Sequence, residues 1–297
     1  MHAVLVSTYD LGHQPLGLAS PASWLRAAGA TVTCLDLSLD RLDEAEIGRA
    51  GLVAFHVPMH TATRLASEII PRVRALNPKA HIVAFGLYAP VNEAHLRSLG
   101  VASVIGGEYE AALVEVLDDL VADRPINGNG ATIHLEKLQF RVPDRSGLPP
   151  LESYGKLIMA DGAERVAGYV EASRGCKHRC RHCPVVPVYD GAFRIVQRDI
   201  VVADIAQQVA AGAQHISFGD PDFFNGPSHG IGVVSALHER FPDLTYDVTI
   251  KVEHLLRHRD LLPTLVETGC LFVTTAVEAL DDDSLDILDK GHTRADF

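Results

Sequence analysis

Three cysteines crowd into one short segment of the chain, where Cys176, Cys180 and Cys183 form the pattern C-x-x-x-C-x-x-C. Cysteine thiolates hold iron–sulfur clusters, which normally use four of them. Three local thiolates can bind three irons of a cubane cluster and leave the fourth iron open for chemistry. The loop comes directly after a strand-like run over residues 166–172. We therefore predict an iron–sulfur site at the end of a β-strand, with one iron that lacks a local protein ligand.

Other uses of closely spaced cysteines are alternatives for this segment. A structural zinc site with His178 or His182 as the fourth ligand would usually carry paired ligand knuckles. A ferredoxin would carry the run C-x-x-C-x-x-C-x-x-x-C, which this sequence lacks. The total of five cysteines is odd, with three packed together, so a disulfide framework is not expected. Cys34 and Cys270 lie in apolar runs and are expected to be buried thiols in a protein of the reducing cytosol.

Composition limits the class of protein. The 297 residues allow two domains at roughly 100–200 residues each, and the 47% of hydrophobic residues suffice for two cores. The formal net charge of −12 and the lack of a long basic stretch argue against a nucleic-acid partner. No apolar run reaches about 18 residues, so no membrane span is expected. The N-terminus lacks a charged region and a cleavage site, so we expect no secretory signal and a cytoplasmic protein.

The elements that must position the first part of the chain alternate between apolar strands and amphipathic helices. Near-continuous apolar strands of this kind predict a parallel sheet covered on both faces, so residues 1–125 are interpreted as a doubly wound α/β domain. The expected strands are 3–7, 31–37, 52–57, 81–85 and 101–105, and the expected helices are 19–28, 63–76, 92–99 and 111–121.

A second α/β run follows a stretch rich in proline, glycine and asparagine, which we interpret as a linker over residues 126–160. The domain over 161–297 holds about four β-α units, too few to close a barrel, and its last strand would be an open edge. We therefore expect a partial (β/α) barrel in a chain that is truncated. The expected strands are 166–172, 215–218, 245–250 and 271–277, and the expected helices are 199–211, 230–240, 254–268 and 281–288.

With its arginine-glycine-cysteine entry at 174–176 and its cysteine loop after the first strand, the second half resembles the radical S-adenosylmethionine superfamily. The resemblance implies that the three cysteines bind a 4Fe–4S cluster. It also implies that S-adenosylmethionine chelates the fourth iron and is cleaved by one electron to a 5′-deoxyadenosyl radical. An external one-electron reductant of the flavodoxin or ferredoxin type is the implied partner, together with a small-molecule substrate.

The same resemblance implies binding residues for S-adenosylmethionine at the carboxyl ends of strands, where active groups of such folds gather. The implied roles are contact with the adenine, with the methionine end, with the carboxylate, and with the ribose or amino group. Read alone, Asp220 and Asp222 are also typical loop caps, Glu278 a solvated carboxylate and Lys251 a surface residue. In the order of the roles, the residues are His182, then Gly219, Asp220 and Asp222, then Lys251, then Glu278.

Joined to this second half, residues 1–125 resemble the cobalamin-binding domain of cobalamin-dependent radical enzymes. Some cobalamin proteins carry D-x-H-x-x-G, in which the histidine ligates cobalt, whereas the loop here reads D-x-x-H-x-x-x-G. The alternative to histidine ligation is a cobalt without a protein ligand and an ordinary polar loop histidine. A nicotinamide or flavin domain is the alternative, but no G-x-G-x-x-G follows the first strand. The implied cobalamin-binding residues are Asp10, Gly12, His13, Thr61, Gly86, Gly107 and Glu108.

Together the two resemblances imply a cobalamin-dependent radical enzyme that methylates an unactivated carbon or phosphinate phosphorus of a small molecule. One S-adenosylmethionine would supply the methyl group and a second the radical. A non-methylating outcome, such as rearrangement, ring contraction or transfer of another group, uses the same cofactors. A non-catalytic fragment that still binds cofactors is a third interpretation, which the early end of the chain suggests.

Overall fold

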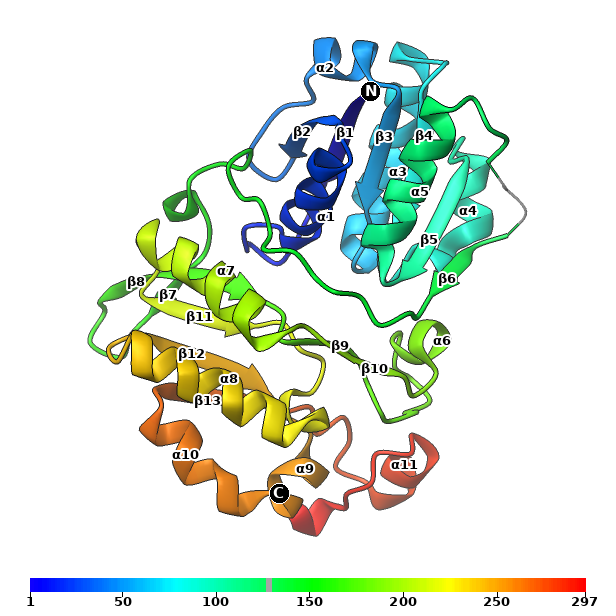
Figure 1. Cartoon of the computed structure of the whole chain (residues 1–297). Helices are drawn as coiled ribbons and strands as arrows, with labels where there is room; N and C mark the ends of the chain where they lie inside the picture. Colours follow the sequence, from blue (N-terminus) through cyan, green and yellow to red (C-terminus); the bar gives the residue numbers. More distant parts are fainter. Residues whose placement is uncertain (127–129) are drawn as a thin grey trace. The chain divides into compact units, whose positions relative to one another are not determined.

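Apolar runs in the first part of the chain pair into one parallel sheet, as the computed structural model of residues 1–126 and 130–297 shows (Figure 1). The chain divides into unit 1, Met1–Pro149, and unit 2, Pro150–Phe297. Unit 1 holds a six-stranded sheet in the order β2-β1-β3-β4-β5-β6, with all neighbours parallel. Its strands are β1 (His2–Ser7), β2 (Thr31–Asp36), β3 (Leu52–His56), β4 (His81–Phe85), β5 (Ser103–Gly107) and β6 (Thr132–His134).

Helices cover both faces of this sheet, which confirms the doubly wound prediction. One core packs the apolar sides of α1 (Leu16–Ala27) and α5 (Tyr109–Val121) against the sheet. The other core contains residues of α2 (Glu44–Arg49), α3 (His60–Leu76) and α4 (Glu93–Ser98). Alternate residues of one strand serve opposite cores, as Leu5 and Val6 of β1 do, because side chains alternate along a strand. The sequence interpretation had no element at α2, a helix of six residues capped by Asp43.

Unit 2 is a partial barrel built on a five-stranded sheet in the order β13-β12-β11-β8-β7. Its parallel strands are β8 (Glu164–Val170), β11 (His215–Phe218), β12 (Thr245–Thr249) and β13 (Cys270–Thr274), and β7 (Lys156–Ile158) runs antiparallel to β8. The predicted fold class is therefore confirmed. β13 is an edge strand with exposed apolar side chains, among them Leu271 and Phe272.

Most helices of unit 2 follow the parallel strands as expected. They are α7 (Arg198–Ala210), α8 (Pro227–Arg240), α9 (Val252–Arg257), α10 (Leu262–Glu267) and α11 (Asp282–Ile287), with the short α6 (Val186–Tyr189) before them. The helix predicted over 254–268 is wrong as a single element. It breaks into α9, a 3-10 turn and α10, because Pro263 cannot continue a helix and instead sits in the first turn of α10.

Two further differences concern segments with few residues. The stretch interpreted as a linker contributes β6 to the sheet of unit 1 and β7 to that of unit 2, and the division between the units falls inside it, after Pro149. A hairpin of β9 (Ser173–Gly175) and β10 (Phe193–Ile195) brackets the cysteine loop. In the described part of the chain, no helix has both the length and the apolar character needed to cross a membrane.

Candidate functional site

The three cysteines of the loop line one cavity of about 180 Å³ at the carboxyl ends of the strands of unit 2. Cys176 follows β9 directly, and a turn closed by the Cys183 N–H and the Cys180 carbonyl at 3.1 Å brings the other two thiols together. The N–H of Arg181 donates to the carbonyl of Leu288 at 3.1 Å, which ties the loop to the end of α11. The three cysteines that the sequence predicts as cluster ligands therefore share one cavity.

Acidic and basic side chains from the ends of three strands share this cavity with the thiols. They come from the segments after β11, β12 and β13 and from the turn after α11. Cys34 belongs to unit 1 and Cys270 begins β13, at the opposite end of the strand. The cavity is lined by Cys176, His178, Cys180, His182, Cys183, Pro221, Asp222, Thr249, Ile250, Lys251, Ala276, Glu278 and Lys290.

The thiols are poised for a metal rather than for free reactivity. Burial raises the pKa of Cys176 and of Cys180, although the ammonium groups of Lys251 and Lys290 lower the pKa of Cys180 in part. A coordinating thiol is deprotonated by the metal itself, so bound iron supplies the positive charge that these buried thiolates need. Three sulfur donors and two lysines on one cavity wall fit an anionic iron–sulfur cluster with an open iron.

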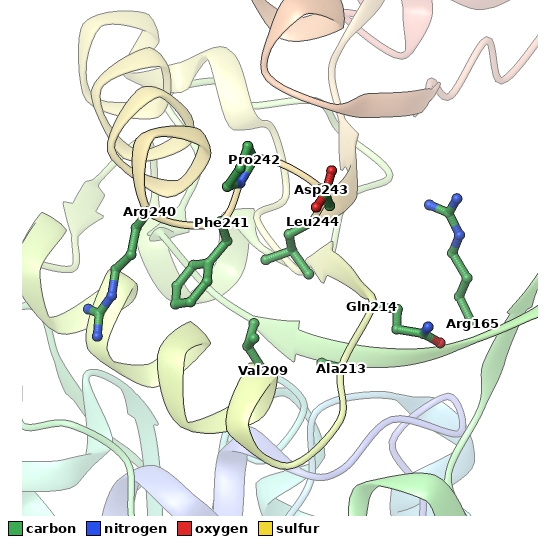
Figure 2. Close-up of a pocket in the computed structure, with 9 residues that line it drawn as sticks. All are labelled: Arg165, Val209, Ala213, Gln214, Arg240, Phe241, Pro242, Asp243 and Leu244. Carbon is green, nitrogen blue, oxygen red and sulfur yellow. The ribbon is translucent and has the colours of Figure 1, made fainter.

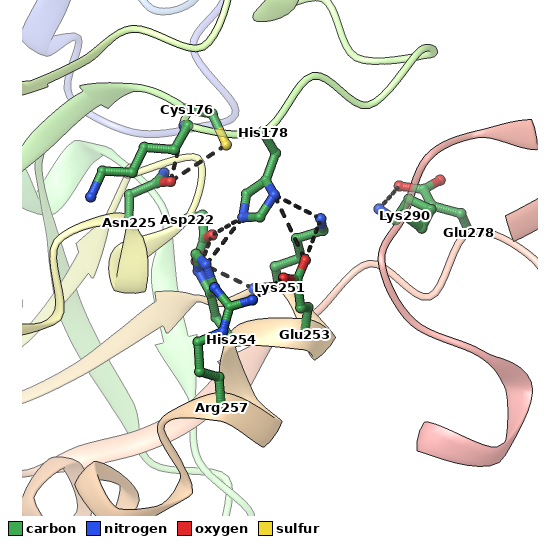
Figure 3. Close-up of polar contacts among 11 residues, drawn as sticks. Cys176, His178, Asp222, Asn225, Lys251, Glu253, His254, Arg257, Glu278 and Lys290 are labelled. Carbon is green, nitrogen blue, oxygen red and sulfur yellow. Dashed lines mark hydrogen bonds and ion pairs between the residues drawn. The ribbon is translucent and has the colours of Figure 1, made fainter. Parts of the chain in front are cut away.

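Glu278 stands beside this cavity in an ion pair, as Figure 3 shows. Its Oε1 lies 3.2 Å from Nζ of Lys290 and 3.1 Å from Nε2 of His182. Burial alone would raise the pKa of Glu278, but the hydrogen bond and charge of Lys290, with His182, hold it below the usual value. The backbone of Glu278 has a φ of 70°, in the left-handed region that costs a non-glycine residue energy. The sequence-predicted pair His182 and Glu278 is thus brought together.

Lys251 also points into the cavity wall, with its side chain only 9% exposed, so it is not a surface lysine. Its Nζ lies 3.1 Å from Oε2 of Glu253 and 3.0 Å from Nδ1 of His178. Burial would raise the pKa of Glu253, but the hydrogen bond and charge of Lys251 lower it below the usual value.

The residues of the segment Gly219–Asp222 have different contacts and different roles. Asp222 lines the cavity, whereas the carboxylate of Asp220 accepts from the N–H of Ala172 at 2.9 Å and from the hydroxyl of Ser173. Gly219 is required by packing, because a Cβ there would lie 1.9 Å from the hydroxyl of Tyr169. Asp220 therefore holds the start of the cysteine loop against the end of β11, whereas Gly219 lets the chain pass close to β8.

Sequence reasoning missed several residues of this site. His254 and Glu253 lie on α9, and Asn225 accepts from the N–H of Lys177 inside the cysteine loop at 3.1 Å. The run Lys251 to His254 directly follows the third predicted strand, and its place at a strand end was the available signal. Lys290 had no such signal, because it reaches the cavity from a turn after α11.

In unit 1, the residues implied for cobalamin gather at the carboxyl edge of the sheet. The loop after β1 carries three of them, the first turn of α3 carries another, and the last three stand directly after β4, at the end of β5 and directly after β5. At this edge Ser7 Oγ and Asp36 Oδ2 are buried and have no hydrogen-bond partner among the described residues. Buried orphan polar atoms at a ligand edge fit a polar ligand with many amide groups. The residues at the edge are Asp10, Gly12, His13, Thr61, Gly86, Gly107 and Glu108.

Two glycines of this edge are required by the protein itself. Gly86 has a φ of 106°, and a Cβ there would lie 3.1 Å from the ring of His56. Gly107 has a φ of 75°, and a Cβ there would lie 2.0 Å from the carbonyl oxygen of His134. The pairing of β5 with β6 therefore requires glycine at 107, whatever the glycine also does toward a ligand.

A larger cavity of about 430 Å³ lies at the opposite ends of the unit 2 strands. Figure 2 shows Arg165 at the start of β8 and Gln214 just before β11 on its wall, with Phe241 and Leu244 across from them. In parallel α/β folds, chemistry gathers at the carboxyl ends of strands and the amino ends serve stability. We therefore assign the chemistry to the cysteine cavity.

Comparisons with known families agree with the division of the chain into two units. The model described as "B12 binding domain" matches residues 2–117, and the model described as "Radical SAM superfamily" matches residues 170–297. The first match excludes the nicotinamide or flavin alternative for unit 1. The second excludes the zinc and ferredoxin alternatives for the cysteine loop.

Two solved structures and one curated protein are similar to this chain. TsrM of Kitasatospora setae, a radical S-adenosylmethionine methyltransferase, was solved with cobalamin and a [4Fe–4S] cluster bound, and aligns at 18% identity with a TM-score of 0.73. Its structure with tryptophan substrate and aza-SAM aligns at 19% identity with a TM-score of 0.77. Both alignments cover 98% of this chain and 62% of that chain. These likenesses show the fold.

The curated protein is threonylcarbamoyladenosine tRNA methylthiotransferase MtaB of Aquifex aeolicus, 24% identical over 154 residues. The match covers 52% of this chain and 34% of that protein, so the chain spans about a third of its length. Two family domains in this order, with three thiols at the strand ends of the second, define one group of proteins. The chain therefore belongs to the radical S-adenosylmethionine enzymes that carry a cobalamin-binding domain, whose cofactors are a 4Fe–4S cluster, S-adenosylmethionine and cobalamin.

Proposed function

We propose that this protein transfers a methyl group from S-adenosylmethionine to an unactivated carbon or phosphinate phosphorus of a small molecule. The observation that carries the proposal is one chain with a cobalamin-binding domain and a radical S-adenosylmethionine domain. The methyltransferase TsrM, whose fold is similar, likewise binds cobalamin and a [4Fe–4S] cluster. When bound, these cofactors supply a one-electron cleavage of the sulfonium and a carrier for the methyl group.

The chain's own residues hold and orient the reacting groups. Cys176, Cys180 and Cys183 would bind three irons through their thiolates and leave the fourth iron to S-adenosylmethionine. Glu278 is ionised because its pKa is low, so its carboxylate would accept from the ammonium group of bound S-adenosylmethionine. Lys251 lines the same cavity and offers its ammonium to a carboxylate. The ring of His182, in the cysteine loop, would contact the adenine.

The electron comes from outside the chain. We propose a flavodoxin-type or ferredoxin-type protein as the donor, because the only sulfur cluster that the described residues support is the one that must be reduced. We also place the protein in the cytoplasm, because its five cysteines are all unpaired and thiols stay reduced there.

The test is anaerobic reconstitution of the full chain with iron, sulfide and cobalamin, followed by incubation with a reductant and S-adenosylmethionine labelled in its methyl group. Metabolite extracts serve as the substrate source. We expect 5′-deoxyadenosine, S-adenosylhomocysteine and a product that carries the labelled methyl group. Deoxyadenosine without S-adenosylhomocysteine would exclude methylation and favour a rearrangement. Bound iron without cleavage of S-adenosylmethionine would support a chain that binds cofactors without catalysis.

A matched pair of cysteine variants assigns the activity to the site. Cys180→Ala removes one of the thiols that line the cavity, so we expect loss of the cluster absorption and of deoxyadenosine formation. Cys270→Ala removes a thiol at the start of β13, outside the cavity, and is expected to keep both. Equal loss in the two variants would contradict the assignment.

A further inference from the structure

Three side chains next to the cysteine cavity bring ligand atoms together without any cysteine. His178 lies in the cysteine loop, Asp222 follows β11, and His254 lies on α9. One ligand atom from each lies within 4.8 Å of the others. Figure 3 shows the two rings and the carboxylate turned toward a common centre. Nε2 of His178 lies 3.1 Å from Nε2 of His254 and 3.9 Å from Oδ2 of Asp222.

The contact between Asp222 and His254 is close but is not a hydrogen bond. Oδ2 of Asp222 and Nδ1 of His254 are 2.7 Å apart, yet neither atom has a hydrogen-bond partner in the part of the chain that the structure describes. Both residues are buried, at 2% and 5% exposed. Two buried polar atoms that face each other in a geometry that fits no hydrogen bond are expensive, and a cation bound to both would satisfy them.

Apart from the two histidines, no charged side chain in the described part of the chain forms an ion pair with this carboxylate. Oδ1 of Asp222 accepts from the backbone N–H groups of Phe224 at 3.3 Å and Lys251 at 3.4 Å, so the carboxylate is fixed in place. The Lys251 ammonium lies against Glu253 and His178. A buried carboxylate normally pairs with a cation or coordinates a metal.

A carboxylate also lies near the second ring nitrogen of His178. A metal-bound histidine usually donates its second ring N–H to a carboxylate, which fixes the ring. Oε2 of Glu253 lies 3.7 Å from Nδ1 of His178, and a small shift brings it within hydrogen-bond distance. In the structure Nζ of Lys251 lies against Nδ1 of His178 instead. When Nε2 of His178 binds the metal, Lys251 must therefore move away so that Nδ1 can donate to Glu253.

We propose that His178, Asp222 and His254 bind one divalent first-row transition-metal ion, separate from the iron–sulfur cluster. Two imidazoles and one carboxylate are a donor set for Zn²⁺ or Fe²⁺, and three protein ligands leave a position open. His178 and Asp222 both line the cysteine cavity, so the open position faces it. The ion links the cysteine loop to the ends of β11 and β12. The proposal does not depend on whether the enzyme transfers methyl groups.

The probe is Co²⁺, whose spectrum reports its ligands. The full chain is first loaded with its cluster, so that the three cysteines are occupied, and is then titrated anaerobically with Co²⁺. We expect one equivalent of bound cobalt with ligand-field absorption and no thiolate-to-cobalt charge-transfer band, and Zn²⁺ should displace it. No binding beyond the cluster, or a thiolate band, would overturn the proposal on the unmodified protein alone.

Substitutions then identify the ligands. Asp222→Asn and His254→Ala should abolish the cobalt signal, and Glu253→Gln should weaken cobalt binding about 10–100-fold, as loss of a supporting carboxylate does. His258→Ala is the matched control, because its ring lies 5.8 Å from that of His254 but outside the donor set. Circular dichroism checks that each variant folds. Cobalt binding that survives in a folded His254→Ala chain would refute the site.

Discussion

A single methyl group at Gly107 should destabilise unit 1 at the carboxyl edge of its sheet. The left-handed backbone at a φ of 75° costs an alanine about 1–2 kcal/mol. Its Cβ would also lie 2.0 Å from the carbonyl oxygen of His134, so β6 must move away. That movement breaks the hydrogen bond from the N–H of Glu108 to the same carbonyl, 2.8 Å long, worth about 1 kcal/mol. We expect Gly107→Ala to lower the free energy of unfolding by about 3 kcal/mol.

Gly12 supplies the matched control. It has a φ of 81°, and a Cβ there would meet nothing within 4 Å. Gly12→Ala therefore pays only for the backbone, about 1–2 kcal/mol. Both substitutions reduce the freedom of the unfolded chain equally, so that contribution cancels in the comparison. The difference between the two variants isolates the clash with β6.

The assay is urea unfolding followed by tryptophan fluorescence. The chain has a single tryptophan, Trp24 in α1, so the signal reports unit 1 and not unit 2. Cobalamin binding, measured by equilibrium dialysis, provides a second readout at the same edge. If Gly107→Ala is no less stable than Gly12→Ala, the pairing of β5 with β6 is not what requires glycine at 107, and the reasoning fails.

Three other predictions test buried polar contacts. Burial raises the pKa of Asp220 to about 7, against about 3.9 in an unfolded chain. The free energy of unfolding should therefore fall by up to about 4 kcal/mol as pH rises between those values. In Asp220→Asn this dependence on pH should be weaker, as measured by urea unfolding followed by circular dichroism at pH 5 and 8. Ser20→Ala removes a 2.6 Å hydrogen bond to buried Glu110 and should cost about 2 kcal/mol by the fluorescence assay; an unchanged midpoint would contradict this. Lys290→Met removes an ammonium that lowers the pKa of Cys180, so iodoacetamide should label that thiol more slowly in cluster-free protein, as read by mass spectrometry.

The fold was predictable where burial dominates the sequence pattern. The strands of unit 1 are buried on both faces, so their apolar runs predicted position and parallel pairing together. Short elements escaped prediction because their stability comes from pairing partners. β6 is three residues long, two of them exposed, and β7 pairs only with β8, so neither carries a strong apolar pattern of its own. Pro263 was a visible signal that the helix over 254–268 breaks.

The site was predictable to the extent that its residues stand at strand ends. The cysteine spacing, Asp222, Lys251 and Glu278 all fall on one cavity wall. What the sequence cannot express is the direction of each side chain. Asp220 and Asp222 are two residues apart, yet one carboxylate turns toward Ser173 and the other toward His254. The binding roles of these residues stay predictions.

The charges of the cavity favour a ligand that carries both signs. Lys251 pairs with Glu253, and Glu278 pairs with Lys290, so each free-standing charge is already balanced within the protein. A ligand with a carboxylate and an ammonium group can pair with Lys251 and Glu278 at once, and Glu253 keeps its ion pair with Arg257. A ligand with one net charge would add that charge to a half-buried site whose own ion pairs balance, which costs free energy. We therefore propose that zwitterionic character, as in the methionine end of S-adenosylmethionine, is what these two ion pairs select.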